Sequence, residues 1–432
     1  MIQTFLPLFY VYEETAMKSY VESSHFFGKE NPEELARKYD TPLYVYNEEN
    51  LREHMRAVAN VITKYPYRAN YSMKANSNLS ILKIALEEGL NADAMSVGEM
   101  MLLLKAGFPS DRIFFVPNNV SEEELQFAID HNIMTSLDSL EQLELFGTLN
   151  PGGKCSVRIN PGVGAGHHEK VVTAGKKTKF GIEEHDVDAI FDIAKKYNLH
   201  IAEINQHVGS QYLDPQPFLD AVENFLRIAE KFDELEYIDF GGGYGIPYHK
   251  LDDEAKFDME SFSARFTALL DAYAAKHPDN LPLFKSEPGR YCVAEGGVIL
   301  GRVHATKQNY GNKYAGTDIG MNVLARPTLY DSWHDIEILR DGKAVTEGER
   351  EKVYVTGNIC ESGDLIAKDR ELPVIQRGDL VCVLDAGAYG FSMSSNYNTR
   401  RRAAEVLITK DGTEKLIRRR ETYEEMFAFF EE

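Results

Sequence analysis

Residues 69–95 read ANYSMKANSNLSILKIALEEGLNADAM, and this stretch contains one complete strand–helix–strand unit. Its two ends are short β-rich runs. The segment between them carries apolar residues at helical spacing and ends near a glycine, as helices often do. Such a unit joins two parallel strands through a helix that covers one face of the sheet. The stretch therefore predicts a parallel sheet with helices outside it.

The same alternation continues along the chain to about residue 287. We expect eight strands, at 69–73, 91–95, 113–116, 133–137, 155–159, 201–206, 236–240 and 283–287. Eight strands separated by amphipathic helices are typical of a closed barrel, and an open doubly wound sheet is the alternative. The predicted fold is therefore α/β, an eight-stranded parallel β/α (TIM) barrel.

The chain has 432 residues, more than one hydrophobic core usually holds, and its pattern changes after about residue 297. From there the runs are β-rich with few helices, which predicts a mostly β C-terminal domain. The run TPLYVYN (41–47) reads as a strand and is expected to join that domain. We therefore predict a barrel at 47–297, inserted between the pieces 1–46 and 298–432 of a β-rich domain.

The composition narrows the classes of partner. A formal net charge of −21 argues against a nucleic-acid or anionic-membrane partner. Four cysteines without a CxxC pair argue against a disulfide framework and against a zinc cage, so we expect no metal site and a cytoplasmic location. The apolar run FLPLFYVY (5–12) is too short for a spanning helix and has no basic residue before it, unlike a signal peptide.

Reactive side chains are expected at the carboxyl ends of barrel strands. The residues that end or follow the predicted strands are Lys74, Asp93, Ser96, Arg158, Asn160, His207, Gly241, Gly242, Gly243 and Glu287. Each has a structural explanation when taken singly; a lysine, for example, can extend its stem over apolar surface and its head into water. Their coincidence on one rim instead predicts an active site.

This combination suits pyridoxal 5′-phosphate (PLP). The cofactor needs a lysine for its Schiff base, and Lys74 is placed for that role. Barrels often bind phosphate in the loops after strands seven and eight, which here contain Gly241–Gly243, Gly289 and Arg290. Glu287 can keep the ring nitrogen protonated, His207 can stack on the ring, and Ser210 can donate to the phosphate.

Several motifs occur in a fixed order: YSMKAN (71–76), DAMSVGE (93–99), HVGSQ (207–211), DFGGGYG (239–245), EPGRY (287–291), RPTLY (326–330), CESGD (360–364) and GAYGFSMSSNYN (387–398). In order and spacing this set resembles the fold-type III PLP-dependent enzymes, the group of alanine racemase and the basic amino-acid decarboxylases.

The resemblance implies that Lys74 carries PLP. The other cofactor-binding residues that it implies are Asp93, His207, Ser210, Gly241, Gly242, Gly243, Glu287, Gly289, Arg290 and Tyr389. It also implies a homodimer with shared active sites, in which the β-rich domain forms part of the interface and CESGD reaches into the partner's site.

The identity of the substrate depends on which side chains of the β-rich domain can bind its distal end. A substrate with two amino-acid heads, meso-2,6-diaminopimelate, needs a group for its distal carboxylate, and arginine matches a carboxylate bidentately. The resemblance assigns substrate binding to Arg290, Arg326, Tyr330, Glu361 and Tyr389, with Glu361 on the distal ammonium. An exposed salt bridge is the alternative for Arg326.

The expected reaction is decarboxylation of meso-2,6-diaminopimelate to L-lysine and CO₂. Cys360 is the candidate proton donor, and an inert buried thiol is its alternative role. Three other readings stay open: a decarboxylase of carboxynorspermidine, ornithine or lysine; an amino-acid racemase; and a catalytically inactive homologue that binds partners.

Overall fold

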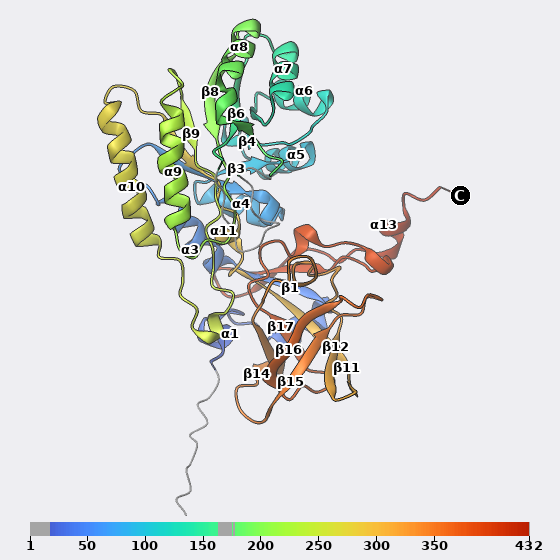
Figure 1. The fold of residues 1–432 in the computed structure, drawn as a ribbon. Coiled ribbons are helices and arrows are strands. Elements are labelled where there is room, and N and C mark those ends of the chain that lie inside the picture. The colour runs from blue at the N-terminus through green and yellow to red at the C-terminus, as the bar shows by residue number, and fades with distance from the viewer. Residues whose placement is uncertain (1–17, 163–174, 176–177, 432) are drawn as a thin grey trace, which may run out of the picture.

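The barrel predicted from the sequence is closed (Figure 1). The computed structural model describes residues 18–162, 175 and 178–431, so the apolar run at 5–12 lies outside the described residues. Eight parallel strands follow the order β5-β4-β3-β2-β10-β9-β8-β6, and a β5–β6 pairing closes the ring. They are β2 (Tyr67–Ser72), β3 (Asn91–Ala94), β4 (Ile113–Phe115), β5 (Met134–Leu137), β6 (Lys154–Asn160), β8 (His200–Asn205), β9 (Tyr237–Asp239) and β10 (Leu283–Ser286), with β7 (Ile182–Glu183) paired beside β6.

One helix, α3 (Glu48–Ala59), precedes the first barrel strand, and the other helices of the barrel follow its strands. They are α4 (Leu79–Glu87), α5 (Val97–Ala106), α6 (Glu122–Asp130), α7 (Leu140–Leu149), α8 (Val187–Tyr197), α9 (Gln216–Ala229), α10 (Met259–Lys276) and α11 (Arg290–Val293). Helix α6 begins with a capping box, since Ser121 and Glu124 each accept the other's backbone N–H.

A second, ten-stranded sheet forms the lower half of the view in Figure 1. Its main path is β14-β13-β17-β11-β1-β18-β19, and β12, β15 and β16 extend from β11. The strands are β1 (Leu43–Asn47), β11 (Gly297–Asn309), β12 (Asn312–Thr317), β13 (Ile336–Arg340), β14 (Lys343–Ala344), β15 (Arg350–Thr356), β16 (Leu365–Pro373), β17 (Leu380–Val383), β18 (Ala404–Ile408) and β19 (Glu414–Arg418). Short helices α1 (Tyr20–Ser23), α2 (Pro32–Tyr39), α12 (Arg326–Tyr330) and α13 (Tyr423–Phe427) accompany it.

Strand β1 lies in this second sheet although the barrel follows it in the chain. It pairs antiparallel with β11 and parallel with β18. Tyr44 and Tyr46 point into the core that is continuous with the barrel, whereas Leu43 and Val45 point into a smaller core under α1 and α2. Burial on both faces explains why this strand reads as an unbroken apolar run. The boundaries at residues 47 and 297 stay predictions.

The second sheet reaches the barrel rim beside Lys74. The Tyr389 backbone N–H donates to the Ala75 carbonyl at 2.8 Å, and Asn76 Nδ2 donates to the Gly387 carbonyl at 2.9 Å. The segment after β17 is therefore bonded directly to the turn that carries Lys74, so both domains position one site.

Within the described part of the chain, no helix is both long and apolar enough to cross a membrane. All four cysteines lie in that part, and all are free thiols.

Candidate active site

A cavity of about 230 Å³ opens at the carboxyl ends of the barrel strands, where the sequence predicts it. The predicted site residues that line it are Lys74, His207, Ser210, Gly243, Glu287, Gly289, Arg290, Arg326, Tyr330 and Tyr389. They come from both domains, and residues as distant in the chain as Lys74 and Tyr389 share one wall. Arg158, near the carboxyl end of β6, lines the cavity as well.

Lys74 lies in a single 3₁₀ turn, Met73–Ala75, directly after β2. The turn is braced on both sides, because the Ser72 N–H donates to the Pro288 carbonyl at 3.1 Å and the Tyr71 hydroxyl donates to the Asn76 carbonyl at 2.8 Å. Lys74 itself is half-buried and faces the cavity. A fixed turn with one partly exposed amine is what a covalent attachment point requires.

Two buried carboxyl groups stand near Lys74. Burial raises the pKa of Glu287, although Lys74 and Arg158 oppose the shift, and Glu287 Oε1 has no hydrogen-bond partner among the described residues. Burial, followed by the charge of Glu287, raises the pKa of Asp93. Asp93 Oδ2 accepts from Ser72 Oγ at 2.8 Å, and Asp93 does not line the cavity. Asp93 therefore touches the site through Ser72.

His207 is a neutral imidazole. Its Nδ1 accepts the Gly242 backbone N–H at 3.2 Å, so the ring proton lies on Nε2. Burial, with Lys74 and Arg158 nearby, holds the His207 pKa well below its usual value. The ring lines the cavity as an uncharged face.

The glycine loop after β9 cannot accept side chains. Gly243 has a φ of +114°, and a Cβ there would lie 2.4 Å from the Gly209 carbonyl oxygen. A Cβ on Gly242 would lie 2.0 Å from the Glu287 carbonyl oxygen, and one on Gly241 would lie 2.3 Å from the Gln206 carbonyl oxygen. Only Gly243 of the three lines the cavity. Glycine is therefore required at all three positions, because the loop packs directly against the backbone carbonyls of neighbouring segments at this rim.

Arg290 and Arg326 line the cavity beside Arg158, and neither forms an ion pair with a carboxylate among the described residues. Arg290 donates to the Tyr248 hydroxyl at 2.7 Å and to Ser210 Oγ at 3.1 Å. Arg326 donates to His334 Nε2 at 2.7 Å and lies 4.6 Å from the centre of the Tyr248 ring. Both side chains are buried, and among the described residues no carboxylate forms an ion pair with either. Burial, with Arg290 nearby, lowers the Arg326 pKa.

Cys360 and Glu361 do not line the cavity of their own chain. Both are exposed: Asn398 Nδ2 lies 3.3 Å from Cys360 Sγ, and the Tyr397 hydroxyl donates to Glu361. Their assigned roles require a cavity outside this chain and stay predictions.

Some residues of the site were not found from the sequence. Ser72, Met95, Asn118, Phe180 and Met393 line the cavity, and Tyr248 and His334 hold the arginines. Tyr248 follows closely after the glycine run, which was a usable signal, whereas nothing in the local sequence marks His334.

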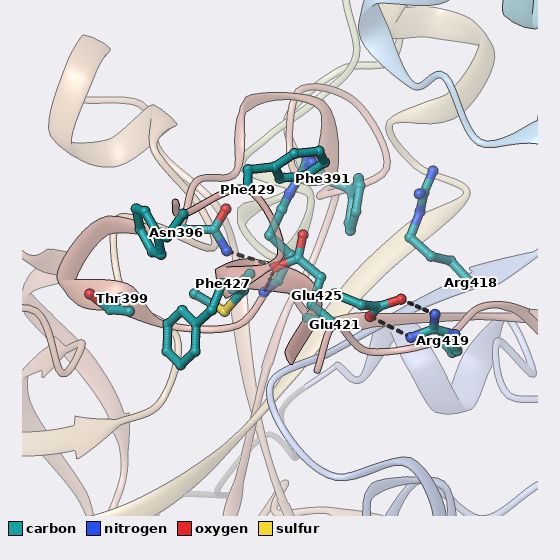
Figure 2. Close-up of a pocket in the computed structure, with 13 residues that line it drawn as sticks. Phe391, Asn396, Thr399, Arg418, Arg419, Glu421, Glu425, Phe427 and Phe429 are labelled. Carbon is teal, nitrogen blue, oxygen red and sulfur yellow. Dashed lines mark hydrogen bonds and ion pairs between the residues drawn. The ribbon is translucent and has the colours of Figure 1, made fainter. Parts of the chain in front are cut away.

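A larger hollow of about 740 Å³ lies around α13 (Figure 2). Its walls carry Phe391, Phe427 and Phe429 together with the Arg419–Glu425 ion pair. It contains none of the residues that end the barrel strands. The volume of a cavity therefore does not by itself identify the active site.

Comparisons with known proteins agree with this geometry. Residues 48–294 match the family model described as the pyridoxal binding domain of pyridoxal-dependent decarboxylases. The chain is 41% identical over 401 residues to the diaminopimelate decarboxylase of Methanothermobacter thermautotrophicus, covering 91% of this chain and 92% of the relative. It is 36% identical over 403 residues to the diaminopimelate decarboxylase of Aquifex aeolicus, covering 90% and 92%.

A solved structure is also similar. The crystal structure of diaminopimelate decarboxylase from Helicobacter pylori complexed with L-lysine superposes with a TM-score of 0.84 at 31% identity, covering 92% of this chain and 98% of the other.

Proposed function

The chain belongs to the family of diaminopimelate decarboxylases, and from this premise we propose that it converts meso-2,6-diaminopimelate to L-lysine and CO₂ with PLP as its cofactor. This reaction is the last step of lysine biosynthesis. The location we propose is the cytoplasm, supported by four free cysteines.

The observation that carries the substrate assignment is the pair of buried arginines. Leaving a guanidinium buried without a counter-charge costs several kcal/mol. We therefore expect Arg290 and Arg326 to bind anionic groups of the ligands. Ornithine and lysine carry only an ammonium at the far end, whereas diaminopimelate carries a second carboxylate. Arg326 and Tyr330 therefore suit the distal carboxylate, and Arg290 suits an anionic group nearer the barrel.

The cavity also fits PLP. Glu287 Oε1 is a buried acceptor with no partner in the part of the chain that the structure describes, and a protonated ring nitrogen would satisfy it. The backbone at Gly243 and Gly289, with Ser210 and Arg290, forms a cradle suited to a phosphate. When bound, PLP supplies an electron sink for the bond that breaks as CO₂ leaves.

The chain's own groups perform the remaining tasks. Lys74, in the turn after β2, would hold the cofactor through its ε-amine. Glu287 would accept a hydrogen bond from the ring nitrogen; burial raises its pKa, and the charges of Lys74 and Arg158 oppose that shift and favour its charged form. His207 would cover one face of the cofactor ring. Its imidazole is uncharged, so it adds no further positive charge to the cavity.

A proton must reach the carbon that has lost CO₂, and we assign Cys360 of a second copy to deliver it, with Glu361 on the distal ammonium. The proposed assembly is a homodimer. Its support is the exposure of both residues and their hydrogen bonds to Asn398 and Tyr397. These two partners lie in the chain between Asn396 and Thr399, which line the hollow around α13 (Figure 2). Phe429 is 92% exposed and Phe430 is 76% exposed on that face, a degree of apolar exposure typical of an interaction surface.

Mixed dimers test the shared sites. The variants Lys74→Ala and Cys360→Ala should each be inactive, and mixing them should restore one intact site in each mixed dimer. Failure of the mixture to regain activity, when each variant is dimeric, would place the two residues in the same chain's site.

Turnover tests the substrate. Purified protein with PLP should release CO₂ and L-lysine from meso-diaminopimelate and should leave ornithine and lysine unchanged. Arg326→Ala should raise KM for diaminopimelate by roughly 10- to 100-fold, the effect of losing a charged hydrogen bond. Arg37→Ala, at an exposed i,i+4 pair on α2, is the matched control. Equal turnover of ornithine or lysine would refute the assignment.

A further inference from the structure

Arg326 and His334 form a buried pair at the wall of the active-site cavity. His334 is 0% exposed and Arg326 is 2% exposed. The pair connects α12 to the segment just before β13, because Arg326 Nη1 lies 2.7 Å from His334 Nε2. The Arg326 Nη2–Ser332 Oγ distance is 3.4 Å, so His334 makes the shorter contact.

The geometry determines the tautomer of His334. A guanidinium can only donate, so His334 Nε2 must be the acceptor and cannot carry a proton. The proton therefore lies on Nδ1, which donates to the Leu384 carbonyl at 2.8 Å. Burial, together with the charge of Arg326, holds the His334 pKa well below its usual value. The imidazole is neutral and has a fixed orientation.

Arg290 is held in the same way. Its Nη1 donates to the Tyr248 hydroxyl at 2.7 Å, and the Tyr248 ring lies 5.7 Å from the Arg290 guanidinium and 4.6 Å from that of Arg326. The His334 ring packs edge-on against Tyr248 with centroids 5.2 Å apart. One aromatic cluster therefore orients both guanidinium groups with neutral acceptors.

Buried cations outside this cavity are held differently. Arg52 forms ion pairs with Glu48 and Glu88, and Lys285 forms one with Glu203 at 2.7 Å. A carboxylate orients a cation but also cancels its charge. At Arg326 the chain instead provides an acceptor that orients the guanidinium and leaves its positive charge for a ligand.

We propose that His334 is a positioning residue for substrate: as a neutral acceptor it fixes Arg326 toward the distal carboxylate without neutralising it. This inference rests on the proposed function. A carboxylate at position 334 would hold Arg326 equally well but would compete with the substrate for it, which gives a physical reason for an imidazole there.

Two isosteric variants separate the two hydrogen bonds of His334. Gln places an acceptor near the position of Nε2 and can keep the bond from Arg326. Asn places a donor near the position of Nδ1 and can keep the bond to Leu384 while losing Arg326. His334→Asn should raise KM for meso-diaminopimelate roughly 10- to 100-fold with little change in kcat. His334→Gln should return KM to within about threefold of wild type, an approximation that allows for imperfect geometry.

A double-mutant cycle with Arg326→Ala tests that His334 acts through the arginine. In the Arg326→Ala background, His334→Asn should add no further increase in KM. The pH profiles of KM for wild type and His334→Gln should coincide between about pH 6 and 8, since a neutral His334 does not titrate there.

Each outcome has a distinct meaning. Four results would each overturn the role of His334. They are an unchanged KM in His334→Asn, equal increases in KM in the Asn and Gln variants, additive effects on KM with Arg326→Ala, and pH profiles that diverge between wild type and His334→Gln. An unchanged KM in Arg326→Ala itself would instead overturn the distal-carboxylate assignment of the proposed function. PLP absorbance and the thermal midpoint of each variant verify that the site is intact when KM is compared.

Discussion

Replacing Gly243 by alanine should damage the cofactor cradle more than its backbone angle alone explains. At φ +114° a side chain adds about 1–2 kcal/mol of backbone strain. The new Cβ would also lie 2.4 Å from the Gly209 carbonyl oxygen and 2.4 Å from Tyr212 Cε2, contacts that force the loop to move. Overpacking of this kind adds about 1–3 kcal/mol, for a total loss of about 2–5 kcal/mol.

Gly89→Ala is the matched control in the same barrel. Gly89 has a φ of +86°, but a Cβ there would meet nothing within 4 Å, so this variant carries the strain without the collision. Thermal unfolding should place the midpoint of Gly243→Ala at least about 2 °C below that of Gly89→Ala, at about 2–4 °C for each kcal/mol.

Cofactor titration gives the second readout. Gly243→Ala should weaken PLP binding about tenfold or more, since a loop distortion of about 1.4 kcal/mol changes the dissociation constant tenfold. Gly89→Ala should bind PLP as wild type does. If the two variants match in both stability and PLP affinity, the cradle does not depend on the close approach at Gly243, and the reasoning is wrong.

Three further predictions concern other parts of the molecule. Lys74→Ala should lose the yellow colour of bound cofactor and at least about 10²-fold in turnover; a coloured, active variant would contradict the attachment at residue 74. Lys285→Met should lower the free energy of unfolding by about 3–5 kcal/mol in urea because it leaves Glu203 buried without its partner, and adding Glu203→Gln should recover part of the loss. A fully stable Lys285→Met would show that this pair is dispensable. Burial raises the pKa of Asp385 to about 7, so its contribution to stability is complete below about pH 4 and is lost as pH rises through 7. Wild type should therefore be less stable in urea at pH 8 than at pH 5, and Asp385→Asn should reduce that difference; an unchanged pH dependence would exclude Asp385 as its source.

The barrel could be predicted because its signals are local. Each strand is a short apolar run, and each helix has its own spacing and caps, as in the capping box of Ser121 and Glu124 on α6. The site residues on the rim followed from one further rule, that the carboxyl ends of parallel strands meet at one face. That rule placed Lys74, His207 and Glu287 around one cavity without any knowledge of their contacts.

The partners of these residues could not be predicted in this way. His334 carries no local signal, and it matters because the Leu384 carbonyl and the Arg326 guanidinium lie on opposite sides of its ring. The pairing of β1 with β11 and β18 likewise joins segments separated by the whole barrel.

The amino-acid sequence by itself determined the elements, the order of the strands along the chain and the chemical groups at their ends, since spacing, capping and residue type act over a few neighbours. Only the tertiary structure decided which acceptors hold the two arginines, which carboxyl oxygen has no partner among the described residues, and that Cys360 is exposed outside its own chain's cavity. Charge balance and burial depend on every atom within a few ångströms, and those atoms come from segments that only the folded chain brings together.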